Sequence, residues 1–171
     1  MNGFRTKNVE IARSWSDAEG LIYKMGTLRE GEEYRAKGCI IKPMEIVLPS
    51  GLSLQYPQLG YEEDPQFNSL RWEYWNGKFF KSLYGGLLIE NIVQALARCI
   101  LGEQMVDINL WLKAPEGRLV HCVHDEVVCI VPDEVADECL AYIVARMSQS
   151  PSWAPDLPLG AEGTVKDHYD K

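Results

Sequence analysis

The residues with the clearest capacity for chemistry are three consecutive ones, His124, Asp125 and Glu126. They separate two strongly apolar segments, residues 118–123 and 127–131, which we predict to be the strands of one hairpin. Aspartate is common in turns and glutamate is not, so two adjacent carboxylates at this position need an explanation. Mg²⁺ prefers carboxylate oxygens and keeps several waters, so one or two carboxylates suffice when substrate phosphates complete its coordination. The pattern indicates either a divalent-metal site or a plain acidic end of a hairpin.

A second polar group lies on a predicted helix over residues 87–104, most of which is apolar around a broad arc at 100° per residue. Asn91, Gln94 and Arg98 fall together on the narrow polar stripe that remains. Their amide and guanidinium groups donate hydrogen bonds of the kind that suit minor-groove acceptors and the DNA backbone. The stripe is equally consistent with the solvated edge of a buried helix.

The remaining elements follow from hydrophobic spacing and turn residues. We expect a helix over residues 8–25 that stops at Gly26, a loop or short irregular helix over 26–38, hairpins pairing 44–48 with 52–56 and 70–75 with 78–83, and a helix over 134–147. Asn76-Gly77 predicts a two-residue type I′ turn in the second of these hairpins. Because the strands come in hairpins and do not alternate with helices, the expected class is α+β, with antiparallel hairpins packed on helices.

The predicted hairpin over residues 70–83 interleaves aromatic residues with Arg71, Lys78 and Lys81. Such a surface is able to stack nucleic-acid bases and contact phosphates. A half-buried pair of structural strands gives the same pattern, so the sequence leaves both interpretations open.

The whole chain is acidic, with a net charge of -8 and a pI near 4.9. This charge opposes nucleic-acid binding unless basic groups cluster locally or another chain supplies most phosphate contacts. The sequence has no apolar run of about 18 residues and no signal peptide, so we expect a cytoplasmic protein with no membrane segment. Its five cysteines form no C-x-x-C pair and are expected to be reduced thiols, mostly in the core.

Residues 123–128, VHDEVV, resemble motif C of the family-A DNA polymerases of the Pol I-like, phage type. Residues 84–98, from YGG to ENIVQALAR, resemble the palm helix of the phage members. Residues 48–57 and the tail over residues 151–163 are similar to the same proteins, so matches in one order cover most of the chain. The resemblance implies a single domain over residues 1–171 with the fold of the C-terminal part of the palm. In it, residues 1–38 follow the fingers, 39–85 form two hairpins, and 86–171 carry motif C and the tail.

The resemblance also implies residue roles. Asp125 is similar to the motif C metal ligand, and Glu126 to its supporting carboxylate. Four residues are expected to contact DNA: His124 near the primer-terminal phosphate, Gln94 at the minor groove, and Asn91 and Arg98 on the stripe of Gln94. Cys99 stands where the family has an aspartate, a difference for which we expect a structural effect.

Two motifs of the family are missing from the chain: motif A, which supplies a second metal-binding aspartate, and motif B, the fingers helix that holds the nucleotide. A two-metal site needs ions about 3.5–4 Å apart, which one Asp-Glu pair cannot hold. The resemblance therefore implies a C-terminal palm subunit or fragment of a split DNA polymerase, inactive alone. Its expected partners are Mg²⁺, a chain carrying motif A and the fingers, primer–template DNA and dNTP, in a bacterial or phage-infected cell.

Three alternatives remain open. The chain could be a non-catalytic scaffold of a replication complex, or an excised fragment of a longer protein. Its first residue, Met1, lies where the family has just left the fingers, which favours a natural split. A small acidic hydrolase is the third alternative, although the carboxylate pair has no nucleophile or third ligand beside it.

Overall fold

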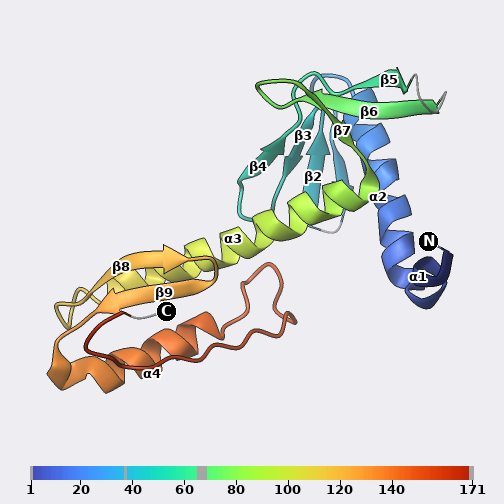
Figure 1. Cartoon of the computed structure of the whole chain (residues 1–171). Coiled ribbons are helices and arrows are strands. Elements are labelled where there is room, and N and C mark those ends of the chain that lie inside the picture. The colour runs from blue at the N-terminus through green and yellow to red at the C-terminus, as the bar shows by residue number, and fades with distance from the viewer. Residues whose placement is uncertain (1, 37, 65–68, 170–171) are drawn as a thin grey trace. The chain divides into compact units, whose positions relative to one another are not determined.

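The computed structural model describes residues 2–36, 38–64 and 69–169 and divides into two compact units, Met1–Leu96 and Ala97–Lys171 (Figure 1). Helix α3 (Gly85–Trp111) contains the division, so it contributes residues to both units. A helix shared in this way does not decide whether either unit folds alone. The single domain expected over residues 1–171 therefore stays a prediction.

The first unit begins with two helices, α1 (Asn2–Lys7) and α2 (Val9–Thr27), the second of which confirms the helix expected over residues 8–25. The buried stripe of α2 consists of Ala18, Ile22 and Met25. The predicted stop at Gly26 is wrong, because this residue lies inside the helix. A β-carbon at Gly26 would meet the ring of Trp72, so the glycine serves close packing and does not end the helix.

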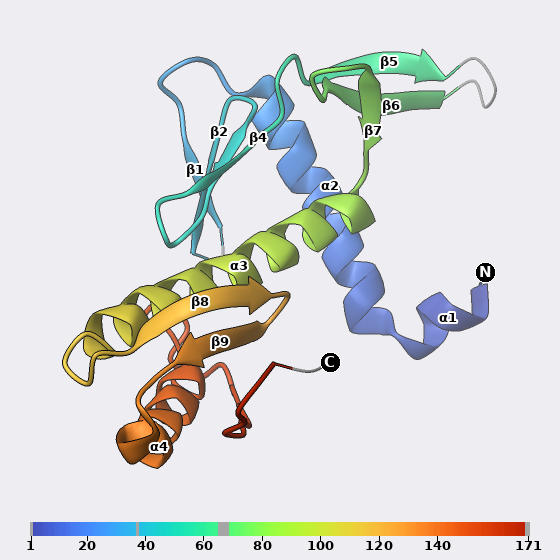
Figure 2. The ribbon, with the colours of Figure 1, turned by 60° about the vertical axis from the view of Figure 1, so that its left-hand side comes forward.

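Four short strands follow α2 and form an antiparallel sheet in sequence order. They are β1 (Tyr34–Ala36), β2 (Cys39–Lys42), β3 (Glu45–Val47) and β4 (Ser53–Gln55). Ile41 and Ile46 are opposite one another in the register, and both are fully buried. Helix α2 runs alongside this sheet (Figure 2), and the Met44 amide donates to the Met25 carbonyl at 3.1 Å. The pairing of β3 with β4 confirms the hairpin expected over residues 44–56.

Strand β1 contradicts the expectation of a loop or irregular helix throughout residues 26–38. It lies at the edge of the sheet, and Tyr34 and Arg35 are exposed. A short edge strand of this kind buries no alternating face, so hydrophobic spacing does not mark it.

A second antiparallel sheet contains β5 (Gly60–Asp64), β6 (Ser69–Trp75) and β7 (Phe80–Leu83). The pairing of β6 with β7 confirms the hairpin expected over residues 70–83, whereas β5 was not predicted. Aromatic rings fix this sheet within the first unit. Trp72, which is 6% exposed, meets Tyr61 and Tyr23, and Tyr74 packs edge-on against Tyr56 with ring centroids 5.0 Å apart.

The predicted type I′ turn at Asn76-Gly77 is wrong. Trp75 pairs with Phe80, so the loop contains the four residues 76–79, and within it only Gly77 has a positive φ, of 96°. The Asn76 side-chain oxygen accepts hydrogen bonds from the amides of residues 78 and 79 at 2.9 and 3.0 Å. The side chain of Asn76 thus organises the loop without the second positive φ that a type I′ turn requires.

Helix α3 starts in direct contact with the backbone of α2. The Gly85 amide donates to the Glu19 carboxylate at 2.6 Å, and a β-carbon at Gly85 would meet the Trp15 carbonyl oxygen. The helix expected over residues 87–104 is confirmed but continues to Trp111. Gln104 therefore lies inside the helix. Its buried side chain donates to the carbonyls of residues 147 and 149 at 3.0 and 3.4 Å.

The second unit packs a hairpin and a helix on the C-terminal half of α3. Its elements are β8 (Arg118–Val123), β9 (Glu126–Ile130), the 3₁₀ turn η1 (Asp133–Val135) and α4 (Ala136–Met147). The core is built on Ile108, Leu112 and Cys139, each at most 1% exposed, and Leu119, Val127 and Cys129 of the hairpin pack against it. Helices α3 and α4 contact one another directly, since Trp111 stacks on Tyr142 with ring centroids 4.0 Å apart, and the hairpin packs beside both helices (Figures 1 and 2). The expected helix over residues 134–147 is thus confirmed, with a 3₁₀ first turn.

The expected combination of helices with antiparallel hairpins is confirmed for the described residues, in which all strand pairing is antiparallel. These described strands form three separate sheets, of four, three and two strands. By length and composition alone, α3 is able to cross a membrane. One such helix is weak evidence, because core helices of soluble proteins pass the same test. The absence of a membrane segment therefore stays a prediction.

The contact between Gly85 and α2 predicts opposite effects for two glycine substitutions. Gly85→Ala should destabilise the chain, because the new methyl group overlaps the Trp15 carbonyl and the backbone must shift. Gly20→Ala is the matched control in α2: nothing lies within 4 Å of its β-carbon position, so it should stabilise by about 0.5–1 kcal/mol. Urea unfolding followed by circular dichroism measures both. Equal stability of the two variants would contradict the close packing.

Candidate functional site

The chemistry-bearing residues lie at the end of the β8–β9 hairpin. Val123 pairs with Glu126, so the turn contains only His124 and Asp125, and the second strand starts one residue earlier than expected. His124 has a φ of 54°, in the left-handed region that two-residue hairpin turns require. Histidine is among the non-glycine residues that tolerate this region. The side chains of residues 124–126 are all exposed.

The two carboxylates at this turn are available to a ligand. Within the described part of the chain, neither Asp125 nor Glu126 forms a hydrogen bond or ion pair. Their oxygens are the hard donors that Mg²⁺ prefers. No group of three or more His, Cys, Asp or Glu side chains arranged to hold a metal occurs among the described residues. The pair therefore fits one edge of a metal site and does not complete one.

Packing and two weak sulfur contacts hold this turn in place. Arg98 donates to the Cys122 sulfur at 3.6 Å, and the Cys122 thiol lies 4.0 Å from the His124 carbonyl oxygen. Arg98, predicted to contact DNA, is thus brought to the base of the turn within the second unit. On the inner side of the hairpin, burial and the neighbouring Cys139 thiol raise the pKa of Cys129 to about 11, so this thiol stays protonated.

The outer side of the same hairpin is only partly covered by the tail, where Tyr169 meets His121 with ring centroids 6.4 Å apart. Val120 is 44% exposed and Ile130 54% exposed. A register shift between Leu119 and His121 leaves Val120 outside the regular pairing. The sheet has two strands, so each of them has one edge with unpaired backbone groups.

A hollow of about 1210 Å³ lies beside the carboxylates and entirely within the second unit. Its walls come from α3, the β8–β9 hairpin, α4 and the tail, and they include Asp125, Glu126, Leu140, Gly163 and His168. Sequence reasoning did not connect His168 with the turn. Residues 148–169 have no regular structure, so no periodic signal predicts where the tail runs.

The predicted polar stripe of α3 does not act as one group. The Asn91 amide donates to the Tyr56 hydroxyl at 3.1 Å, and Gln94 is exposed and donates to Glu90 at 3.2 Å. Burial raises the pKa of Tyr56, and the Asn91 hydrogen bond opposes this shift. Asn91 and Gln94 belong to the first unit and Arg98 to the second. Gln94 is therefore accessible to a ligand, whereas Asn91 already has a partner in the protein.

Cys99 is 6% exposed and thus belongs to the interior of the second unit. An unpaired carboxylate at such a position would carry a large desolvation cost. The thiol present here is a small apolar group that needs no charged partner.

Comparison with known proteins connects the whole chain to a polymerase. It is 33% identical over 179 aligned positions to the DNA polymerase of Bacillus phage SP02. The match covers 100% of this chain and 27% of the phage protein, so the chain spans about a quarter of its relative's length. No family model and no solved structure matches the chain. The chain is therefore related to part of a phage DNA polymerase.

Because Asn91 and Gln94 have different surroundings, their replacement by alanine should lower the free energy of unfolding by different amounts. Asn91→Ala should lower the free energy of unfolding by about 1 kcal/mol, because the Tyr56 hydroxyl, in a side chain 2% exposed, loses its donor. Gln94→Ala should change it by no more than about 0.5 kcal/mol. Urea unfolding of both variants, with Tyr56→Phe to complete a double-mutant cycle, measures the difference. A large cost for Gln94→Ala would show that Gln94 belongs to the core.

The incomplete set of ligands predicts weak metal binding by the chain alone. Asp125 and Glu126 offer too few fixed oxygens to replace the waters of Mg²⁺, so titration calorimetry should show no saturation in the micromolar range. The Asp125→Asn, Glu126→Gln double variant is the matched control and should remove the weak binding that remains. Micromolar affinity of the unaltered chain would contradict the incomplete site.

Proposed function

We propose that this chain is the C-terminal palm part of a family-A DNA polymerase and contributes motif C to two-metal nucleotidyl transfer. The observation that carries the proposal is the turn of the β8–β9 hairpin. It presents two adjacent, exposed carboxylates that form no hydrogen bond or ion pair with the described residues, in a chain related to a phage DNA polymerase over its whole length. A structural turn gains nothing from two neighbouring negative charges, whereas a metal site needs them.

The proposed roles rest on the resemblance to motif C and the palm helix, and the exposure of the side chains supports them. Asp125 holds a divalent cation, and Glu126 in the adjoining strand supports it. Mg²⁺ bound there would activate the primer 3′-hydroxyl and neutralise charge on the transferred phosphate. His124, exposed at the same turn, donates to the primer-terminal phosphate, and Gln94 donates to minor-groove acceptors. Arg98 supports the turn through Cys122 and lies beside the DNA backbone.

A further polypeptide completes the proposed enzyme, either a partner chain of a split polymerase or another part of a longer protein. It supplies motif A, the fingers and the dNTP site, for which this chain has no counterpart. The partial exposure of this hairpin supports the proposal. Val120 and Ile130 are about half exposed, and among the described residues no further strand pairs with either edge of the two-stranded sheet.

The distribution of charge also supports a partner. Residues 97–171 contain six Lys and Arg and thirteen Asp and Glu, a net charge of -7. Residues 1–96 contain eleven Lys and Arg and twelve Asp and Glu, a net charge of -1. The unit with the proposed metal site therefore repels DNA by itself. We expect most phosphate contacts to come from the partner, and little affinity of this chain alone for primer–template at physiological salt. As a replication protein, it would act in the cytoplasm of a bacterial or phage-infected cell.

A non-catalytic scaffold of a replication complex is the second candidate. The lack of a third metal ligand among the described residues favours it, because a scaffold does not need a complete site. Scaffold and polymerase subunit both require a partner. They differ in whether Asp125 is necessary for nucleotide incorporation.

Asp125→Asn tests the proposed function. The change keeps the size of the side chain and removes a metal-binding charge, so folding and partner binding should persist. The rate of primer extension by the complex with the polypeptide that carries motif A should fall about 10²–10³-fold or more. Glu126→Gln should lower the rate of primer extension by a smaller factor, since Glu126 only supports the metal.

The matched control for this test is Asp156→Asn in the tail, where an exposed carboxylate outside the hairpin loses the same charge. It should extend primers at the unaltered rate. An Asp125→Asn complex that extends primers at the unaltered rate would identify the chain as a scaffold.

A further inference from the structure

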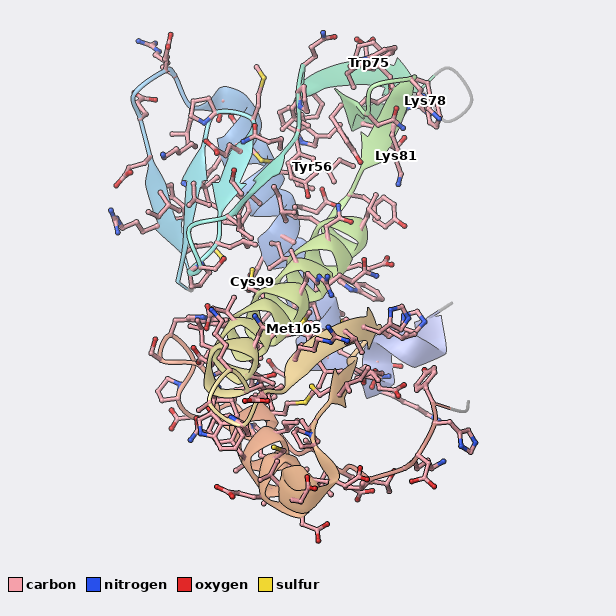
Figure 3. The ribbon with its side chains drawn as sticks, turned by 90° about the vertical axis from the view of Figure 1, so that its left-hand side faces the viewer. Tyr56, Trp75, Lys78, Lys81, Cys99 and Met105 are labelled. Carbon is pink, nitrogen blue, oxygen red and sulfur yellow. The ribbon has the colours of Figure 1, made fainter. Side chains whose placement is uncertain are left out.

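The end of the β6–β7 hairpin, far along the sequence from the proposed metal site, is a second surface with capacity to bind. We define the β6–β7 tip as Trp75, Lys78, Phe79, Phe80 and Lys81; Figure 3 labels Trp75 and both lysines on this hairpin. Phe79 is 59% exposed and Phe80 48% exposed. Two large aromatic side chains exposed side by side in the sequence are costly in water, which indicates a surface that a ligand covers.

The charge of the tip is opposite to that of the chain. Lys78 and Lys81 are exposed, and neither has an ion-pair partner among the described residues. The segment from residue 74 to 89 contains both lysines and no acidic residue, in a chain with a net charge of -8. The nearest carboxylate on the strand, Glu73, is paired with Arg71 at 2.7 Å. The tip is therefore a local positive surface whose ligand carries negative charge.

The tip is held in one conformation before any ligand binds. The side-chain oxygen of Asn76 accepts hydrogen bonds from the backbone amides of Lys78 and Phe79. The backbone amide of Asn76 donates to the Phe79 carbonyl at 3.2 Å. The Trp75 amide donates to the Pro57 carbonyl at 2.8 Å. A loop organised by such bonds loses little conformational entropy on binding.

The strand register places the aromatic residues together. Trp75 and Phe80 are paired across the strands and lie on one face, with ring centroids 5.3 Å apart and planes inclined at 62°. Lys81 pairs with Tyr74 on the other face, while Lys78 and Phe79 lie in the turn. Lys78 in the turn thus lies next to the aromatic face, whereas Lys81 is exposed on the opposite face of the edge strand β7.

We infer that the β6–β7 tip binds single-stranded nucleic acid, with bases stacked on Phe79 and Phe80 and phosphates at Lys78 and Lys81. Exposed aromatic rings combined with unpaired cations are the features that single-strand binding surfaces share. The choice of nucleic acid as the ligand rests on the proposed polymerase function, in which an unpaired template strand is present. An acidic protein segment, the other ligand with this charge, is an outcome of the test.

The test measures binding of a fluorescein-labelled oligothymidylate to the full chain by fluorescence anisotropy, over a range of salt concentrations starting at low salt. Lys78→Gln and Lys81→Gln should each weaken binding and lower the slope of log K against log salt by about 0.7, the value for one phosphate contact on a single strand. The Phe79→Ala, Phe80→Ala double variant should weaken binding about tenfold and leave the slope unchanged, because stacking releases no counterions.

Matched controls lie elsewhere on the chain. Lys7→Gln and Lys113→Gln remove exposed lysines outside the tip, and Leu52→Ala removes an exposed apolar side chain from another turn. These variants should bind the oligonucleotide as the unaltered chain does. Circular dichroism should show all of the variants folded, since the substituted tip side chains are exposed.

Absence of oligothymidylate binding at low salt would overturn the inference. So would tip variants that bind like the unaltered chain, an outcome that leaves the tip to a protein ligand, or controls that weaken binding equally. Oligonucleotide binding is measured on this chain alone, without the metal or the polypeptide that primer extension requires. Failure of the tip variants to affect binding is therefore distinguishable from failure of Asp125→Asn to affect primer extension.

Discussion

The first turn of α3 is the constraint on which much of the structure depends. At Gly85 the backbone of α3 meets the backbone of α2 with no space for a β-carbon, and the Glu19 carboxylate accepts the Gly85 amide at 2.6 Å. The same helix supplies Ile108 to the core beneath the β8–β9 hairpin. One continuous helix thus serves the packing of the first unit and the support of the candidate site in the second.

The candidate site is compatible with folding because its charges remain hydrated. Two unit charges about 4 Å apart repel by only about 1 kcal/mol in water, and Asp125 and Glu126 are both exposed. The cost would rise if a partner covered the turn and excluded water, unless a cation entered at the same time. The proposed metal and the proposed partner are therefore linked, because covering this turn would favour a cation bound to its carboxylates.

The two units differ in electrostatics, although one helix joins them. The second has a net charge of -7 and carries the carboxylates, whereas the first is nearly neutral and carries the exposed lysines of the β6–β7 tip. A polyanion such as DNA would be attracted to the tip and repelled by the carboxylates. The positive surface of the tip is thus far along the chain from the carboxylates suited to bind metal.

The sequence by itself determined α2, α3, α4 and three hairpins, because apolar spacing reports which face of an element is buried. It also located the acidic turn, since strand signals on both sides left only residues 124–126 between them. Tertiary structure alone decided the rest. The sequence predicts a helix stop at Gly26, but the structure shows that the Trp72 ring leaves no space there for a β-carbon. The sequence likewise predicts a free donor at Asn91, but the Tyr56 hydroxyl accepts its hydrogen bond. The path of the tail to the hollow beside Asp125 also has no local signal, because contacts between distant residues fix it.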